Sequence, residues 1–298
     1  MKVSVVLAAY NAEKYLALAV ESILRQSFRD FELILIDDHS SDASGQIMKD
    51  FAGQDPRIVV LENEENLGLT KSLNRGLAIA KSEYIARMDA DDIARPSWLE
   101  KHVSFLDAHT DYTFVSCIGR YIDENGKEEQ LRHFPETNEE IRAMMPKVDA
   151  MMHPGVVFRR EDVAKIGNYC EDYRVVQDYD LWFRGMAAGY KFYNIQEPLI
   201  LFRRNDTYNS RKSRAYRMID YRVRKKGYKL NKVPLYKYVY LAIPLALAYI
   251  PPKVMDKFFY VLKGFDPRTR AAKEKTHGKT GATSEQSSSA VSVGEEGR

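Results

Sequence analysis

The sequence predicts an α/β fold in which a mixed, mostly parallel sheet is flanked by helices. Two observations lead to this prediction. Short apolar runs rich in β-branched residues alternate four times with segments whose apolar residues recur at helical spacing. The chain has 298 residues, of which 45% are hydrophobic, so it can bury a sizeable core as one large domain or two small ones.

The first half of the chain contains the four strand–helix units. The predicted strands are residues 3–9, 31–36, 58–61 and 83–86. The predicted helices are residues 12–28, 41–51, 66–80 and 96–109. Strands that are connected through helices run parallel with right-handed crossovers, so these four strands are expected to lie in one sheet.

Regular alternation ends after residue 109. A strand is predicted over residues 114–122, and Asn125-Gly126 is a hairpin turn signal. Thr137 and Glu140 form a capping box at the start of another helix. The remaining predicted elements are a strand entered from the loop at 151–158, a helix over 181–187 that Gly189 ends, and a closing strand at 199–202. The second half is therefore expected to be mixed.

The chain changes character after Arg203. Residues 203–279 contain 21 lysines and arginines against 5 aspartates and glutamates, which suggests a surface facing nucleic acid or anionic lipid. Residues 233–262 are too apolar for a nucleic-acid arm and too interrupted by proline to span a bilayer. We favour attachment to the inner face of the cell membrane; the alternative is a helical subdomain packed on the core or on another subunit.

Three regions follow from this pattern: a folded domain over 1–204, a basic and apolar extension over 205–265, and a disordered tail over 266–298. The two cysteines, Cys117 and Cys170, form no disulfide framework or metal-ligand spacing, which suits a reducing cytoplasm. The apolar start of the chain is better explained as a buried strand than as a signal peptide, because Tyr10-Asn11 stands where a cleavage site should be.

Three carboxylates, Asp89, Asp91 and Asp92, arrive directly after the fourth predicted strand. Ligands of open α/β sheets bind outside the carboxyl ends of the strands. Asp89 and Asp91 point to one side of an extended chain, and a hard divalent cation can relieve their repulsion. These residues predict a metal–phosphate site. The alternative is a solvated acidic turn with Asp92 near a helix N-cap.

Two more acidic pairs lie at the expected binding edge, Asp37/Asp38 and Asp178/Asp180. Carboxylates at such an edge can accept hydrogen bonds from a nucleobase or ribose, hold a cation, or act as a general base. All three kinds of work together describe the transfer of a group from a nucleotide-activated donor to a hydroxyl.

In their order along the chain, these motifs resemble those of family 2 glycosyltransferases. The matching segments are VSVV with Tyr10-Asn11, DDHSSD at 37–42, NLG at 66–68, DADD at 89–92 and QDYDLW at 177–182. The resemblance covers residues 2 to about 204, roughly two thirds of the chain. It implies the GT-A nucleotide-sugar fold, here with a C-terminal helical extension, and an inverting, metal-dependent transfer from a nucleotide sugar, in most members a UDP-sugar.

The resemblance also implies roles on the nucleotide side. Tyr10 and Asp38 match the positions that hold the base, and Ala8 and Ala9 line it. Lys71 matches a basic position near the nucleotide. Ala8-Ala9 departs from the proline or threonine that is common in the family, which bears on the identity of the base and not on the fold.

On the transfer side, Asp89 matches the ribose-side position and Asp91 the ligand of Mn²⁺ or Mg²⁺. Asp178 matches the catalytic base, which must be desolvated or lie beside Asp180 to be effective. The family usually has glutamate where this chain has Gln177.

Four residues are candidates for a donor or acceptor pocket: His153, Asp180, Trp182 and Arg203. Each has a plainer explanation. Trp182 is more typical of a core or pocket wall than of a sugar-stacking platform, and a single histidine is more often structural. Arg203 would clamp the diphosphate or lie on a solvated edge.

The expected partners are a nucleotide-sugar donor, a saccharide or lipid-linked saccharide acceptor and an anionic membrane surface, without nucleic acid. These partners fit a cytoplasmic protein at the inner face of the membrane that takes part in the assembly of cell-surface polysaccharide or glycolipid. One alternative is a sugar-phosphate nucleotidyltransferase, which needs a glycine-rich loop where residues 8–15 contain no glycine. The other is an inactive, membrane-bound sugar-nucleotide scaffold, against which Asp91 and Asp178 argue.

Overall fold

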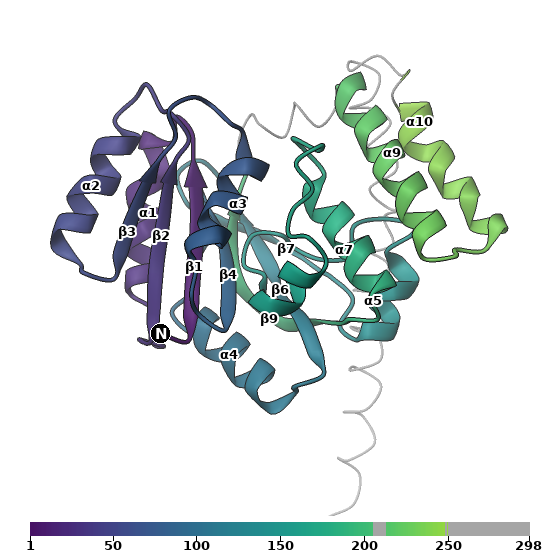
Figure 1. Ribbon diagram of the computed structural model, residues 1–298, viewed down its shortest axis with the longest axis horizontal. Coiled ribbons are helices and arrows are strands. Elements are labelled where there is room, and N and C mark those ends of the chain that lie inside the picture. Colours follow the sequence, from purple (N-terminus) through teal and green to yellow (C-terminus); the bar gives the residue numbers. More distant parts are fainter. Residues whose placement is uncertain (205–212, 248, 250–298) are drawn as a thin grey trace, which may run out of the picture.

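The computed structural model describes residues 1–204, 213–247 and 249. Over these residues the chain forms one nine-stranded sheet with helices on both faces, which confirms the predicted fold class (Figure 1). The strand order is β3-β2-β1-β4-β8-β6-β9-β5, and β7 pairs with β6 beside this path.

The first four long strands form a parallel unit, as predicted. They are β1 (Val3–Ala9), β2 (Phe31–Asp37), β3 (Ile58–Glu62) and β4 (Tyr84–Asp89). The helices of this half are α1 (Glu13–Leu24), α2 (Ser44–Gln54), α3 (Leu69–Ile79) and α4 (Trp98–Ala108). All residues of β1 and β2 are buried, since helices cover both faces of the sheet.

The second half is mixed. Its strands are β5 (Ile93–Ala94), β6 (Tyr112–Ile122), β7 (Glu128–Arg132), β8 (Val157–Arg159) and β9 (Lys191–Arg203). Strand β6 runs parallel to β9 and antiparallel to β7 and β8. Its helices are α5 (Asn138–Met144), α6 (Arg160–Lys165) and α7 (Gln177–Ala187). The capping box of Thr137 and Glu140 at the start of α5 is confirmed.

Three local predictions differ from the structure. Strand β9 starts at Lys191 and not at residue 199, because irregular pairing with β6 hides its alternation in the sequence. The short strand β5 intervenes before α4, whose N-cap is Ser97. The alternative that made Asp92 part of a solvated turn near an N-cap is therefore wrong; Asp92 is 1% exposed.

The sheet separates two apolar layers. One layer contains side chains of α1, α2 and α4, such as Leu16, Met48 and Trp98. The other contains side chains of α3, α5, α6 and α7, such as Leu73 and Trp182. Both layers stabilise the same central strands, so the carboxyl ends of these strands are held in fixed register.

The described part of the C-terminal extension is helical and packs on α7. It consists of α9 (Arg214–Leu230), the 3₁₀ helix η1 (Leu235–Leu241) and α10 (Ala242–Leu247). Gly227 of α9 lies so close to Phe183 that a Cβ there would be 2.3 Å from the ring. Tyr228 donates a hydrogen bond to the carbonyl of Pro146. Of the helices within the described ranges, none is long and apolar enough to cross a membrane. The tail predicted over 266–298 lies outside the described residues.

Buried His102 on α4 makes stability depend on pH. Burial lowers its pKa to about 4, against about 6.5 in an unfolded chain. Between these values the unfolded state binds more protons, so stability is complete above about pH 6.5 and is lost as pH falls. The expected loss from pH 7.5 to pH 5 is about 2 kcal/mol of unfolding free energy.

Urea unfolding at pH 7.5 and pH 5 measures this loss. We expect the His102→Gln variant to lose less stability over this interval than the wild type, whereas the exposed-site control His109→Gln keeps the wild-type dependence. Equal pH dependence of His102→Gln and the wild type would contradict the assignment.

Candidate active site

The ends of β1, β2 and β4 bring the predicted site residues to one edge of the sheet. Ala8 lies opposite both Ile36 and Asp89, and Ala9 lies opposite Asp37. The backbone N–H of Asp38 donates to the carbonyl of Ala9 over 2.9 Å. The parallel pairing therefore places the acidic segments after β2 and β4 at the same edge of the sheet, on either side of the end of β1.

Asp38 organises the loop that enters α3. It is 3% exposed. Its Oδ1 atom accepts hydrogen bonds from Asn63 Nδ2 and from the backbone N–H of Leu67, over 2.5 and 2.9 Å. Its Oδ2 atom accepts the backbone N–H of Gly68 over 2.8 Å. Each oxygen thus already has a protein donor, and a base would have to use the remaining lone pairs.

The other predicted base-side residues lie at the end of β1 and at the start of α3. Ala8 and Ala9 are buried at the end of β1, and Tyr10, just beyond them, is 52% exposed. Lys71, in the first turn of α3, lines a pocket of about 340 Å³ together with residues 65–68 and Arg174. Both the aromatic ring and the lysine can therefore reach a ligand at this edge.

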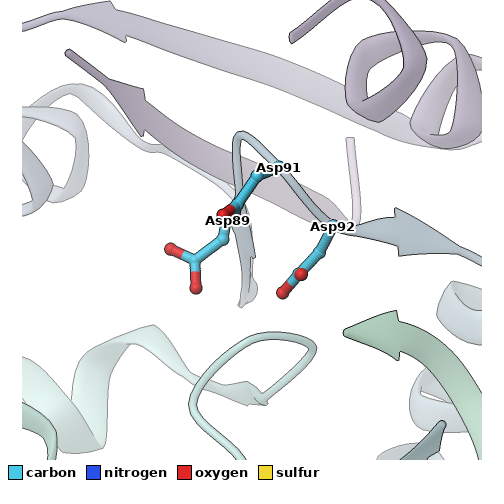
Figure 2. A group of neighbouring side chains, drawn as sticks. All are labelled: Asp89, Asp91 and Asp92. Atoms are coloured by element: carbon cyan, nitrogen blue, oxygen red, sulfur yellow. The ribbon is translucent and has the colours of Figure 1, made fainter. Parts of the chain in front are cut away.

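The three carboxylates after β4 form one cluster. Asp89, Asp91 and Asp92 each offer an oxygen within 4.8 Å of the others (Figure 2). Burial, reinforced by the negative charge of Asp89, raises the pKa of Asp91 to about 6. Burial and both neighbouring carboxylates raise the pKa of Asp92 well above its usual value. The fold therefore crowds negative charge at this point.

This cluster fits a hard divalent cation. It offers only oxygen ligands, which Mg²⁺ and Mn²⁺ prefer. Asp92 Oδ1 accepts the backbone N–H of Arg203 over 2.8 Å. Asp92 Oδ2 is buried and has no hydrogen-bond partner among the residues that the structure describes. A cation would satisfy this oxygen and offset the crowding. The sequence predicts Asp91 as the ligand, and the position of Asp92 makes it a second candidate.

A buried cation, Arg87, connects the cluster to the other half of the site. Arg87 is 2% exposed, and its two terminal nitrogens bind both oxygens of Asp89, one of them over 2.8 Å. Burial opposes its charge, but the negative charges of Asp89 and Asp178 and the hydrogen bonds to Asp89 outweigh this and raise the pKa of Arg87. Asp89, which binds the guanidinium, and Asp178 thus both favour the charge of Arg87. Arg87 was visible in the sequence motif, but nothing in the motif distinguishes it from a solvated arginine.

Asp178 lies in the first turn of α7. Its side chain is 23% exposed, and its Oδ1 atom accepts the backbone N–H of Tyr179 over 2.8 Å. Val176, the residue before this helix, has a φ of 63°. This left-handed conformation is costly for a β-branched residue and persists only where packing enforces it, often at functional sites.

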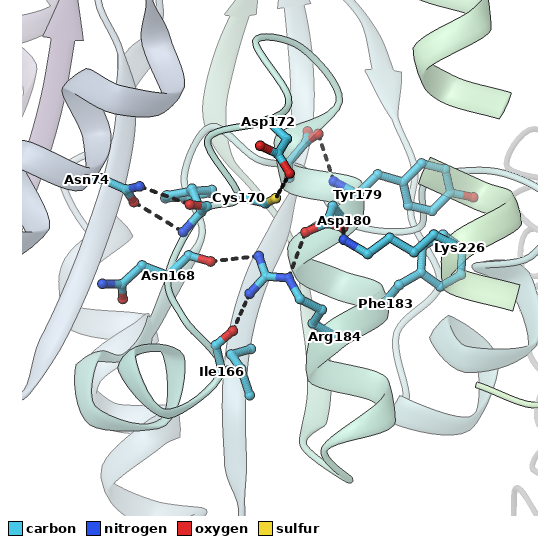
Figure 3. Close-up of polar contacts among 12 residues, drawn as sticks. Asn74, Ile166, Asn168, Cys170, Asp172, Tyr179, Asp180, Phe183, Arg184 and Lys226 are labelled. Carbon is cyan, nitrogen blue, oxygen red and sulfur yellow. Dashed lines mark hydrogen bonds and ion pairs between the residues drawn. The ribbon is translucent and has the colours of Figure 1, made fainter. Parts of the chain in front are cut away.

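Asp180 lies inside the fold. It is 3% exposed. Arg184 Nε donates to it over 2.6 Å, and Lys226 of α9 approaches it to 3.4 Å (Figure 3). The same guanidinium donates to the carbonyls of Ile166 and Asn168. Asp180 therefore ties α7 to α9 and, through Arg184, to the preceding loop.

Trp182 and Arg203 are also internal. Trp182 is fully buried, with its ring edge-on to Phe114 and His153, so it presents no open face to a sugar. Arg203 is 3% exposed and donates to the backbone carbonyls of Asp91 and Asp123. It thus supports the turn that carries the acidic cluster. His153 is 7% exposed and lies 3.9 Å from Asp178.

Known proteins resemble this chain in sequence and fold. The family model described as "Glycosyl transferase family 2" matches residues 4–167. EpsE of Bacillus subtilis, provisionally assigned as a glycosyltransferase, is 35% identical over 260 residues, 86% of this chain and 92% of EpsE. The amylovoran biosynthesis glycosyltransferase AmsE of Erwinia amylovora is 32% identical over 217 residues, 72% of this chain and 80% of AmsE.

Two solved structures share the fold. The crystal structure of S. aureus TarS 1-349 in complex with UDP has a TM-score of 0.64 at 20% identity, and the match covers 82% of this chain and 71% of that one. The mannosyltransferase PcManGT from Pyrobaculum calidifontis, in complex with GDP-Man and Mn²⁺, has a TM-score of 0.58 at 17% identity, over 91% and 83% of the two chains. The predicted GT-A fold is confirmed.

Proposed function

Because the chain belongs to glycosyl transferase family 2, we propose that it moves a sugar from a nucleotide sugar to a hydroxyl group in a metal-dependent, inverting reaction. One observation carries the proposal. The Asp89–Asp92 cluster follows β4, and Arg87, which binds Asp89, also responds to the charge of Asp178 at the start of α7. A carboxylate cluster suits a cation and diphosphate, and a separate carboxylate suits a base.

The proposed chemistry assigns the proton to Asp178. Its carboxylate accepts the proton of the acceptor hydroxyl as the oxygen attacks the anomeric carbon. The bond between that carbon and the diphosphate oxygen breaks, and its electron pair leaves with the diphosphate. Attack opposite the leaving group inverts the anomeric configuration in one displacement.

The proposed binding roles follow the same edge. Asp91 and Asp92 would hold Mn²⁺ or Mg²⁺, and Asp89, whose two oxygens bind Arg87, would face the ribose. Such a cation supplies Lewis-acid neutralisation of charge on the departing diphosphate. Tyr10, Asp38 and the residues beside them would take the nucleoside.

We propose a UDP-sugar as the donor and surface polysaccharide assembly as the setting. TarS was crystallised with UDP and PcManGT with GDP-Man, so related folds accept either base. AmsE is named for the biosynthesis of a polysaccharide. An acceptor that is a saccharide or lipid-linked saccharide suits this setting. Membership of the family sets aside the nucleotidyltransferase alternative.

Thermal-shift measurements with UDP, GDP, CDP and ADP, each with and without Mn²⁺, test the proposal. We expect UDP with Mn²⁺ to raise the Tm, because a ligand at 100 times its Kd adds about 2.7 kcal/mol of stability. A rise in Tm with GDP and with no other nucleotide would identify the donor as a GDP-sugar instead of a UDP-sugar. No shift with any nucleotide and Mn²⁺ would contradict the function.

We also propose that one face of the extension binds an anionic lipid bilayer. The face consists of exposed apolar residues of η1 and α10 and of one residue two positions beyond α10: Leu235, Tyr236, Val239, Ile243 and Tyr249, which are 50 to 82% exposed. Residues 213–249 contain nine lysines and arginines against one aspartate. Apolar side chains inserted among headgroups, with basic residues near them, are typical of interfacial attachment.

Sedimentation with vesicles that contain anionic phosphatidylglycerol tests this surface. We expect the variant Leu235→Ser/Tyr236→Ser/Val239→Ser to lose most of the vesicle-bound fraction, because it removes the apolar anchor. The control Leu18→Ser, an exposed leucine on α1, should bind as the wild type does. A lipid partner would be contradicted if the triple variant bound vesicles as well as the wild type does. It would also be contradicted if the wild type bound no vesicles and formed a dimer that these substitutions dissociate.

A further inference from the structure

His153 lies between the proposed base and a buried tyrosine. Its Nδ1 atom is 3.9 Å from Oδ2 of Asp178, and its Nε2 atom is 2.8 Å from the hydroxyl of Tyr169. Edge-on ring contacts with Tyr169 and Trp182, at 5.5 and 6.1 Å between centroids, fix the plane of the imidazole. The ring therefore directs one nitrogen at each neighbour.

Tyr169 is held firmly on its own side. The side chain is 2% exposed. Asn74 of α3 clamps its backbone: Asn74 Nδ2 donates to the carbonyl over 2.9 Å, and the Tyr169 N–H donates to Asn74 Oδ1 over 3.1 Å. Burial raises the pKa of Tyr169, so its hydroxyl keeps its proton. The hydroxyl is thus available as a donor at a fixed position.

The chemistry of these three groups selects a tautomer. A carboxylate only accepts hydrogen bonds, whereas a phenol can donate or accept. The arrangement that suits all three has Tyr169 donating to Nε2, which leaves the proton of His153 on Nδ1, the atom that faces Asp178. Asp178 Oδ1 already accepts the backbone N–H of Tyr179, so a second contact at Oδ2 would fix the plane of the carboxylate.

We propose that His153 is a positioning residue for Asp178, and that Tyr169 selects the tautomer that directs Nδ1–H at the base. The inference rests on the proposed function, since it requires Asp178 to be the base. The 3.9 Å separation is longer than a hydrogen bond, and catalytic contacts of this kind shorten when the substrate is bound. Misplacing a reacting group by about 1 Å costs about 100-fold in rate.

Two amide substitutions of His153 distinguish the role of its Nδ1 atom from that of its Nε2 atom. His153→Asn keeps an N–H donor near the position of Nδ1, and His153→Gln keeps one near Nε2. Donor hydrolysis, with water as the acceptor, gives kcat and the donor KM for the full chain with Mn²⁺ and the UDP-sugar. We expect His153→Gln to lose about 10- to 100-fold in kcat at an unchanged donor KM. His153→Asn should stay within a few-fold of the wild type, and Tyr169→Phe should fall between them.

The outcomes distinguish this inference from the proposed function. Equal kcat losses for the asparagine and glutamine variants, or no loss in either, would overturn positioning through Nδ1 while Asp178→Asn still abolishes hydrolysis. If Asp178→Asn itself keeps wild-type hydrolysis, the proposed base is wrong. A donor KM that rises in proportion to the loss of kcat/KM would assign His153 to donor binding and overturn the inference.

Discussion

An Asp178→Asn variant is expected to lose about 10²- to 10⁴-fold in kcat, the usual contribution of a general base. Asparagine has the same shape, so the first turn of α7 and the hydrogen bond from Tyr179 to Oδ1 can remain. It cannot accept the proton of the acceptor hydroxyl. The donor-dependent rise in Tm should therefore be that of the wild type, while turnover is lost.

Asp180→Asn is the matched control on the same helix. Asp180 is buried with Arg184 and Lys226 as its partners. Removing its charge leaves the half-buried Arg184 without its carboxylate partner, and breaking a buried pair in this way costs roughly 3 kcal/mol. We expect this variant to show a lower Tm and, below that Tm, turnover close to the wild type. Donor binding that is lost together with turnover in Asp178→Asn would contradict the role of base.

An Asp91→Asn variant is expected to lose the Mn²⁺-dependent part of nucleotide binding and, with it, at least about 100-fold in turnover. Asparagine retains one oxygen but not the charge that a hard cation requires. The metal-free variant should be at least as stable as the wild type, because burial and Asp89 oppose the charge of Asp91. A gain in stability combined with a loss of function is typical of a site where charge is crowded for a ligand.

Thermal shift with and without Mn²⁺, followed by donor hydrolysis, measures both effects. Asp50→Asn, an exposed carboxylate on α2, is the control and should behave as the wild type in both assays. If Asp91→Asn keeps the wild-type response to Mn²⁺ plus nucleotide, the cluster is not the metal site. Loss of the response together with a large fall in the metal-free Tm would instead indicate a structural role for Asp91.

The parallel half of the sheet could be predicted from the sequence because its information is local. β1 and β2 are largely apolar, with Ser4 and Glu32 as the polar residues inside them, and they end at Ala9 and Asp37, which lie opposite each other. The acidic cluster was predictable for the same reason, since three carboxylates follow one strand within four residues. Strand β5, of two residues, is too short for any periodic signal.

The contacts that were not predicted join distant parts of the chain. Arg203 supports the turn at Asp91 from 112 residues away. His153 approaches Asp178 from one loop, and Tyr169 contacts His153 from another. A local pattern gives the type of each residue but not its partner, so Arg203 and His153 had several acceptable explanations until the fold brought their neighbours together.

The packing of α9 on α7 has a practical consequence for dissecting this enzyme. A fragment that stops at residue 204 would uncover the ring of Phe183, leave the Pro146 carbonyl without its tyrosine donor and remove the ammonium beside Asp180. All three losses fall on the helix that carries Asp178 or on the segment packed against it. Truncation would therefore confound loss of lipid attachment with damage to turnover. Substituting exposed side chains of η1 tests lipid attachment without disturbing α7.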